Sequence, residues 1–222
     1  MKIAISGTHG VGKTTLAKSL AKKLNLPLIE EVARGVAQRY GFKNTEQIKK
    51  AENNKRYSFQ HEVFYEQVAE ESLKSSFISD RSVFDPLAYC LYYGIAIPDN
   101  WARMAELQSM SYDFIIYCPI PRYEISDDGF RLTDKNSQQY IDTTTRILLN
   151  YARCPVLELG KNRDNWEDEV MECIRKREKE KLPAELEPIA QLLKDNPKLL
   201  ANVKTALERL DNDEMRNRRE RE

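Results

Sequence analysis

Residues 7–14 read Gly7-Thr8-His9-Gly10-Val11-Gly12-Lys13-Thr14. They match the motif G-x-x-x-x-G-K-[ST] at every fixed position. Residues 2–6, which precede them, have the apolar, β-branched character of a short buried strand. After them, Leu16, Leu20 and Leu24 recur every fourth residue with lysines between, a pattern typical of an amphipathic helix. The motif requires this strand–loop–helix context, which a chance glycine-rich turn would not provide.

Each position of this loop has a physical reason to bind a phosphate chain. The glycines let the backbone turn its N–H groups inward, and a helix that begins near Lys13 directs its positive end to the same point. Lys13 would lie between the β- and γ-phosphates of ATP or GTP, and the Thr14 hydroxyl is a hard oxygen ligand for Mg²⁺. We expect the side chain of His9 to point outward and to have no chemical role. The residues predicted to bind the nucleotide are Gly7, Thr8, His9, Gly10, Val11, Gly12, Lys13, Thr14 and Thr15.

Strand patterns alternate with helical patterns along the first 181 residues. The predicted strands are residues 2–6, 28–29, 77–79, 114–118 and 156–159. Helical periodicity covers residues 13–24, 32–76, 86–93, 101–110, 137–151 and 166–181. Such alternation indicates a parallel sheet with helices on both faces. We therefore predict an α/β fold, the three-layer sandwich of a P-loop NTPase, with a parallel five-stranded sheet.

The composition changes after residue 181. Residues 182–222 contain no glycine and no strand pattern, and they form two amphipathic stretches separated by Asn196-Pro197. We predict a domain over residues 1–181 and a helical C-terminal extension over residues 182–222. The extension would pack on the domain or on a second copy of the chain in a homodimer, or it would bind another partner.

Bulk composition favours a small-molecule ligand. Lys plus Arg and Asp plus Glu number 35 each, so the formal net charge is zero, whereas nucleic-acid binding needs a basic excess. The four cysteines form no Cys-x-x-Cys pair, and with only two histidines a zinc site is not expected. No apolar run resembles a signal peptide or a membrane span. We expect a cytoplasmic protein with reduced cysteines and no membrane partner, and the neutral charge disfavours a nucleic-acid partner without excluding a local basic patch.

Acidic side chains follow two of the predicted strands. Glu30 and Glu31 end the strand at residues 28–29, and Asp80 follows the strand at residues 77–79. Ligands of open α/β sheets bind at the carboxyl ends of the strands, so all three carboxylates are candidates for one crevice. Two alternatives stay open: the glutamates would favour the first turn of a helix, and Asp80 would cap the next helix.

The stretch Phe77-Ile78-Ser79-Asp80-Arg81-Ser82-Val83-Phe84-Asp85-Pro86-Leu87-Ala88-Tyr89 resembles the strand-end "DR…S…AY" signature of thymidylate-kinase-like and deoxynucleoside-kinase-like P-loop proteins. It is more similar still to the AAA-type ATPase/kinase family, which includes the ribosylnicotinamide kinase domain of bacterial NAD-biosynthesis regulators. That family also resembles the chain at residues 30–34 and 128–131. The similarity covers roughly residues 1–178.

The resemblance implies roles for matched positions. Asp80 would contact Mg²⁺, together with Thr14, or the acceptor. Arg81 would hold the acceptor's phosphate or the reacting oxygens, since a guanidinium binds phosphate bidentately. Glu30 or Glu31 would accept the proton of an acceptor hydroxyl. The predicted catalytic residues are Lys13, Asp80, Arg81, Arg131, Glu30 and Glu31.

The loop at residues 122–136 would close over the site. Arg131 would stabilise the transferring phosphoryl group, with Arg122 a weaker candidate, and closure would exclude water that otherwise hydrolyses the γ-phosphate. The chain departs from the family pattern in having one or two arginines there rather than a dense cluster. Two acids also compete for the role of base, and the acceptor pocket has no recognisable signature.

Residues 40–75 are the expected wall of an acceptor pocket. Within them, residues 57–60 loosely resemble the helix from which nucleoside kinases read a base; we favour a core position for Phe59 and leave Gln60 open. Residues 162–163 lie where related proteins pack the adenine of ATP.

Three functions remain. The first is an ATP- and Mg²⁺-dependent kinase for a nucleoside, a nucleoside monophosphate or a similar metabolite. The second is a polynucleotide-end kinase, against which the neutral charge argues. The third is a regulatory P-loop NTPase that acts through protein interaction by its helical extension.

Overall fold

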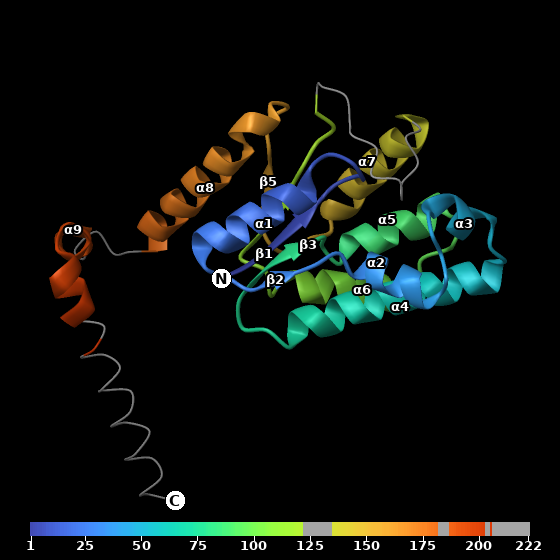
Figure 1. Cartoon of the computed structure of the whole chain (residues 1–222), viewed down its shortest axis with the longest axis horizontal. Coiled ribbons are helices and arrows are strands. Elements are labelled where there is room, and N and C mark those ends of the chain that lie inside the picture. Colours follow the sequence, from blue (N-terminus) through green and yellow to red (C-terminus); the bar gives the residue numbers. More distant parts are fainter. Residues whose placement is uncertain (122–134, 182–186, 203–204, 206–222) are drawn as a thin grey trace, which may run out of the picture. The chain divides into compact units, whose positions relative to one another are not determined.

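A computed structural model describes residues 1–121, 135–181, 187–202 and 205 of the chain (Figure 1). It divides into two units, Met1–Met171 and Glu172–Glu222, which are described separately below. Helix α8 (Trp166–Lys181) contributes to both units. The domain boundary expected at residue 181 stays a prediction.

The first unit contains a five-stranded sheet. Its order is β2-β3-β1-β4-β5, and every neighbouring pair is parallel. The strands are β1 (Lys2–Ser6), β2 (Leu28–Ile29), β3 (Phe77–Asp80), β4 (Phe114–Tyr117) and β5 (Val156–Glu158). This confirms the predicted parallel sheet, with strand ends shifted by one residue at most.

The register of the strands shows where the candidate site lies in the sheet. Ile5 on β1 pairs with Asp80 on β3, and Ser6 pairs with Tyr117 on β4. The carboxyl ends of the three central strands therefore lie side by side at one edge of the sheet. The loop after β1 begins at this edge, which is where ligands bind in open parallel sheets.

The helices of the first unit flank this sheet (Figure 1). Their bounds are α1 (Lys13–Leu24), α2 (Val32–Arg39), α3 (Thr45–Lys50), α4 (Asn53–Ser72), α5 (Phe84–Tyr92), α6 (Asp99–Ser109) and α7 (Lys135–Leu149), followed by the 3₁₀ turn Arg163–Asn165 and the start of α8. Helix α1 packs on β1, β2 and β3, while α4 packs on α2 and α5, and α5 packs on α7. The fold is that predicted for a P-loop NTPase.

The long helical region expected at residues 32–76 is three helices. Gly41, with φ of 73°, ends the turn after α2, because this conformation is open to glycine and costly for other residues. Ala51 is extended at the end of α3, with ψ of 157°, and so separates α3 from α4. Periodicity alone could not locate these breaks, since apolar residues continue on both sides of them.

The core lies between the sheet and these helices. Phe64 on α4 stacks on Trp101 on α6 with ring centroids 5.1 Å apart, and both side chains are buried. Leu16 and Leu20 of the predicted α1 stripe are also buried. Burying large aromatic side chains contributes a sizeable part of the stability of such a domain.

In the second unit, α9 (Glu187–Asp195) ends immediately before Asn196 and Pro197. Helical structure resumes at residues 197–202. The break predicted there is confirmed within the described part of the extension. None of the described helices in the chain is both long enough and apolar enough to cross a membrane.

Candidate functional site

The loop between β1 and α1 has the backbone geometry expected of a phosphate cradle. Gly7, Gly10 and Gly12 have φ angles of 138°, 75° and 110°. A Cβ atom at Gly7 would lie 2.5 Å from the carbonyl oxygen of Cys118, so no larger residue fits without displacing the backbone directly after β4. Gly12 is also the N-cap of α1, which leaves the first N–H groups of this helix directed at the loop.

Two side chains at the start of α1 face the interior of the site. Lys13 is 3% exposed, and its ammonium donates to the carbonyl oxygen of Thr8 at 2.5 Å. Thr14 donates to Asp80 at 2.6 Å, whereas Thr15 is exposed. The buried hydroxyl of Thr8 has no hydrogen-bond partner within the described ranges. A buried polar atom without a partner is costly, and a ligand oxygen would satisfy it.

The prediction that the His9 side chain points outward is wrong. His9 is 4% exposed, and its Nδ1 lies 3.3 Å from the hydroxyl of Tyr89 on α5. Gln138 on α7 also donates to the His9 carbonyl oxygen at 3.3 Å. The loop is therefore covered by α5 and α7 at this position, which its sequence alone does not reveal.

Asp80 lies at the end of β3, next to the loop. It is 3% exposed and accepts the hydrogen bond from Thr14. It does not cap the next helix, because the N-cap of α5 is Val83, so that alternative is wrong. The two oxygens of Thr14 and Asp80 are hard donors of the kind that Mg²⁺ prefers.

These two oxygens suit a cation that keeps most of its ligands from water and phosphate. Across the described residues, no group of three or more His, Cys, Asp or Glu side chains gathers to hold a metal alone. Mg²⁺ commonly binds through one or two protein oxygens together with nucleotide phosphates. The donor set therefore fits Mg²⁺ carried by a nucleotide.

Arg81, directly after β3, has a strained backbone and a side chain that pairs with two carboxylates. Its φ is 129°, a rare conformation for a residue with a side chain. Its Nε donates to Glu31 at 2.8 Å and its Nη2 lies 2.7 Å from the same oxygen, while its Nη1 lies 3.1 Å from Asp85. Burial lowers the pKa of Arg81, but the charges of Glu31, Tyr89 and Asp85 outweigh it and raise that pKa above its usual value.

The structure separates the two neighbouring glutamates. Glu30 is exposed, whereas the side chain of Glu31 is 7% exposed and pairs with both Arg81 and Arg34. Only Glu31 of the two faces the cavity described next. The alternative that the glutamates start a helix holds in part, since Glu31 is the N-cap of α2, but its side chain makes no capping hydrogen bond and no acidic residue lies in the first turn.

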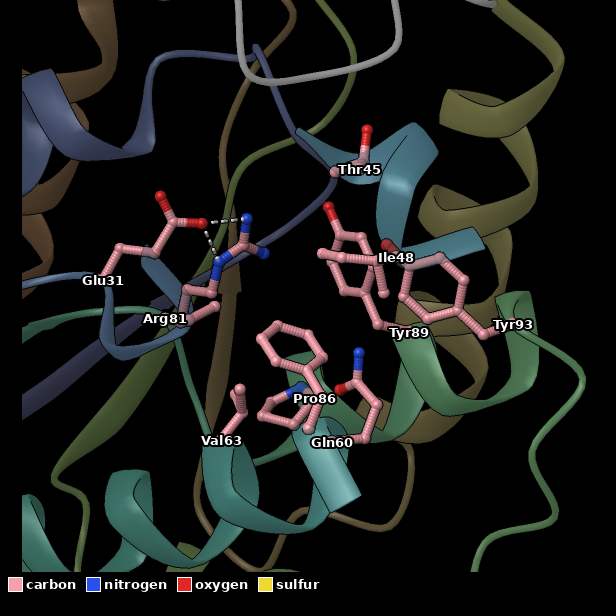
Figure 2. Close-up of a pocket in the computed structure, with 11 residues that line it drawn as sticks. Glu31, Thr45, Ile48, Gln60, Val63, Arg81, Pro86, Tyr89 and Tyr93 are labelled. Carbon is pink, nitrogen blue, oxygen red and sulfur yellow. Dashed lines mark hydrogen bonds and ion pairs between the residues drawn. The ribbon is translucent and has the colours of Figure 1, made fainter. Parts of the chain in front are cut away.

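A cavity opens beside the Glu31–Arg81 pair (Figure 2). Its volume is about 450 Å³, open solvent at its mouth included. Five of its lining residues come from the wall expected at residues 40–75: Thr45, Ile48, Phe59, Gln60 and Val63. The others are Glu31, Ala33, Arg81, Pro86, Tyr89 and Tyr93. We call this cavity the acceptor pocket.

Two residues of α4 have different roles in this wall. Phe59 is 2% exposed and packs edge-on against Tyr40 and Phe42, so its predicted core position is confirmed. Gln60 is 3% exposed, and its amide makes no hydrogen bond to any described residue. Figure 2 shows this amide directed into the acceptor pocket on the side of Tyr89 and Tyr93. A buried amide with free donors and acceptors is a ready partner for a polar ligand edge.

Two predicted features lie at the margins of the described site. The side chain of Arg163 lies against Gly12, since a Cβ there would be 2.9 Å from Arg163 Cδ, so the 162–163 segment does border the loop. Arg131 and Arg122, the expected lid arginines, lie outside the described residues, as does the stretch 128–131 that contributes to the resemblance.

The sequence reasoning missed Asp85. This carboxylate is 1% exposed and accepts hydrogen bonds from Ser6, Gly7 and Ser82 in addition to its ion pair with Arg81. Its position inside the quoted Phe77–Tyr89 stretch was the available signal. An acidic residue one turn after Asp80-Arg81 looks like an ordinary helix start, so the pattern gave no reason to single it out.

Residues 2–168, well over half of the chain, match the AAA domain family. The chain belongs to the AAA domain family. Among curated protein sequences, none matches this AAA domain protein.

Solved structures resemble it in fold. YorR of Bacillus subtilis, in complex with phosphorylated GDP, is 18% identical with a TM-score of 0.51, covering 80% of this chain and 98% of its own. Deoxyadenosine kinase from M. mycoides, with the products dCMP and a flexible dCDP bound, is 17% identical with a TM-score of 0.55, covering 79% and 99%. NadR in complex with NR is 20% identical with a TM-score of 0.52, covering 77% of this chain and 50% of NadR. At these identities the likeness shows the P-loop kinase fold that the resemblance implied.

Proposed function

We propose that this AAA domain protein is a kinase that transfers the γ-phosphate of ATP or GTP, in complex with Mg²⁺, to the hydroxyl of a small acceptor. The acceptor class is a nucleoside or a nucleoside monophosphate, and the geometry favours the nucleoside. The observation that carries the proposal is the buried Glu31–Arg81 pair, which lines the acceptor pocket, with Arg81 directly following the Asp80 that accepts from Thr14.

The pair gives the acceptor end of the site a base. Phosphoryl transfer to a hydroxyl requires that its proton leave as the oxygen attacks, and a carboxylate within hydrogen-bond reach accepts it. Glu31 has the burial and position for this role, while Glu30 faces solvent. Arg81 holds the Glu31 carboxylate in place. Arg81 would also direct its remaining N–H groups at the reacting oxygens.

The charge of the acceptor pocket supports an uncharged acceptor. Of its described lining residues only Glu31 and Arg81 carry formal charges, and these are of opposite sign and paired with each other. A phosphate monoester carries about two negative charges near pH 7, which would lie beside a carboxylate with the one lining cation already paired. A nucleoside brings hydroxyls and a base without this cost.

The nucleotide would bind at the loop between β1 and α1. The loop N–H groups and the N-terminus of α1 bind the phosphates, and Lys13 neutralises charge that develops on the transferring group. Thr14 and Asp80 would hold Mg²⁺, which neutralises the phosphate oxygens when bound. As the acceptor oxygen bonds to the γ-phosphorus, the bond to the bridging oxygen breaks and the nucleoside diphosphate leaves.

Recognition of a base would fall to Gln60, Tyr89 and Tyr93. The Gln60 amide offers a donor and an acceptor side by side, which matches the paired polar atoms of a heterocycle edge. The tyrosine rings provide flat apolar surface on which a base can stack. Arg131 remains the proposed residue for closing the site over the γ-phosphate.

The experiment is ADP release with Mg²⁺-ATP, and with Mg²⁺-GTP, across a panel of nucleosides, nucleoside monophosphates and nicotinamide riboside. A no-acceptor reaction and an oligonucleotide with a free 5′-hydroxyl serve as controls. Strong stimulation by a nucleoside is the expected result. Slow turnover that no acceptor stimulates would overturn the proposal and favour the regulatory NTPase, with the helical extension as its output.

A further inference from the structure

We propose that Asp85 is a positioning residue that ties the phosphate-binding loop to the Glu31–Arg81 pair, an inference that rests on the proposed kinase function. Asp85 would touch neither the nucleotide nor the acceptor. It acts through Gly7 on one side and through Arg81 on the other. Binding at one end of the site is thereby linked to the geometry of the other end.

The two oxygens of Asp85 divide their partners between these ends. Its Oδ2 accepts from Ser6 Oγ at 2.6 Å, from Ser82 Oγ at 2.8 Å and from the Ser82 N–H at 3.0 Å. Its Oδ1 accepts from the Gly7 N–H at 3.3 Å and lies 3.1 Å from Arg81 Nη1. One oxygen therefore joins the ends of β1 and β3, and the other joins the first loop N–H to the arginine of the acceptor pocket.

Both residues held by Oδ1 have unusual backbone conformations. Gly7 has φ of 138° and Arg81 has φ of 129°, and for Arg81 this conformation is strained. Strain of this kind persists only where the surroundings impose it. For Arg81 the surroundings include Asp85, Glu31 and a hydrogen bond from Gln67 to the Arg81 carbonyl oxygen at 3.4 Å.

A fully buried carboxylate is stable here because its partners compensate it. Five contacts satisfy its oxygens, one of them charged, and its place in the first turn of α5 is favoured by the helix dipole. An apolar residue would fill the same volume without these polar demands. Using a carboxylate at this point makes the positions of Gly7 and Arg81 depend on each other.

The test separates this role from a structural one. Asp85→Asn keeps the size of the side chain but replaces one accepting oxygen by a donor, so it cannot satisfy both sets of partners. We expect the affinity for Mg²⁺-ATP and the affinity for the stimulating nucleoside each to fall about tenfold, as loss of hydrogen bonds to a charged group predicts. In the Arg81→Gln background the effect on nucleoside affinity should shrink to about twofold or less, because the route through Arg81 is gone. The effect of Asp85→Asn on ATP affinity should persist in the Arg81→Gln background, because that effect depends on the contact with Gly7.

Ser109→Ala is the matched control. Ser109 is buried and accepts the Arg153 N–H at 2.9 Å, far along the chain from the loop. Ser109→Ala should lower the free energy of unfolding while leaving the affinities for Mg²⁺-ATP and for the nucleoside unchanged. Ser6→Ala removes a single partner of Asp85 and should shift both affinities in the same direction as Asp85→Asn, which gives a measurement should the Asn variant fail to fold.

The outcomes are distinct. Equal losses of nucleoside affinity in the wild-type and Arg81→Gln backgrounds, or unchanged affinities in Asp85→Asn and Ser6→Ala, would overturn the inference while the kinase function stands. A wild-type protein that neither binds nor is stimulated by any panel acceptor would overturn the proposed function and, with it, the inference.

Discussion

Arg81 Nη2 lies 2.7 Å from Glu31 Oε1, and both side chains are less than a tenth exposed. Buried ion pairs are weak evidence for stability, since desolvation offsets most of the attraction between the charges. They are costly to break from one side, because the remaining charge is left buried alone. A pair of this kind at the edge of a pocket is better explained by what it does to a ligand than by what it adds to folding.

Glu31→Gln should lower kcat for acceptor phosphorylation by about 10²- to 10⁴-fold, the usual contribution of a positioned base. The KM for ATP should change little, since Glu31 lies at the acceptor end. Glu30→Gln is the control, because the adjacent glutamate is exposed. Steady-state kinetics of the two variants checks this. Similar rates for both would show that Glu31 is not the base.

Lys13→Ala should abolish nucleotide turnover while leaving the fold intact. Lys13 is buried and bonded to the Thr8 carbonyl oxygen within the loop, so its charge lies where the phosphates would bind. ADP release measures the loss, and circular dichroism checks the fold. Surviving turnover would mean that the loop does not bind phosphates in the manner described.

Gly7→Ala should destabilise the protein far more than Gly41→Ala. Both glycines have positive φ, which alone costs an alanine about 1–2 kcal/mol. The Cβ at Gly41 would meet nothing within 4 Å, whereas at Gly7 it would lie 2.5 Å from the Cys118 carbonyl oxygen. Urea unfolding of both variants gives the free energies of unfolding. Equal losses would contradict the close approach of Cys118, directly after β4, to the loop.

Glu71 should make stability depend on pH. Burial raises its pKa from 4.5 to about 7, against hydrogen bonds from Tyr112, Gln67 and Gln108 that lower it. Because the folded state holds the proton more tightly, the stabilising contribution is complete below pH 4.5 and is lost as pH rises through about 7. One unit of pKa shift corresponds to about 1.4 kcal/mol, so the free energy of unfolding should fall by about 3 kcal/mol over this pH range.

Glu71→Gln removes this titration and should unfold at higher urea than the wild type at pH 8, with a smaller gain at pH 5. Glu70→Gln on the same helix is the control, since the Glu70 side chain is 43% exposed. Urea midpoints measured from pH 5 to 8 follow the effect. Parallel profiles for wild type and Glu71→Gln would contradict the raised pKa of Glu71.

Local signals determined most of the fold. The motif at residues 7–14 and the alternation of strands with helices predicted the parallel sheet, because both depend on short-range periodicity and on glycine geometry. The three-way division of residues 32–76 was not predicted, since it depends on two backbone conformations within a continuous apolar pattern.

The sequence pointed to several candidate residues of the site, but it did not reveal the contacts between them. Lys13, Thr14 and Asp80 could be named because each occupies a motif position or a strand end. The choice of Glu31 over Glu30 depends on which side of the chain faces the pocket, and the burial of His9 depends on α5 and α7 covering the loop. The contacts that Asp85 makes with Ser6 and Ser82 depend on β1 and β3 being neighbours in the sheet, a long-range fact that no local pattern contains.

The central claim is that a phosphoryl group moves from the nucleotide to a small hydroxyl acceptor. The most direct measurement follows a radiolabelled γ-phosphate of ATP, with Mg²⁺ and each nucleoside of the panel, and separates the products by chromatography. The account predicts label in a nucleoside monophosphate, formed by the wild type and strongly reduced in Glu31→Gln. Label recovered only as inorganic phosphate, at the same rate with and without every acceptor, would contradict it.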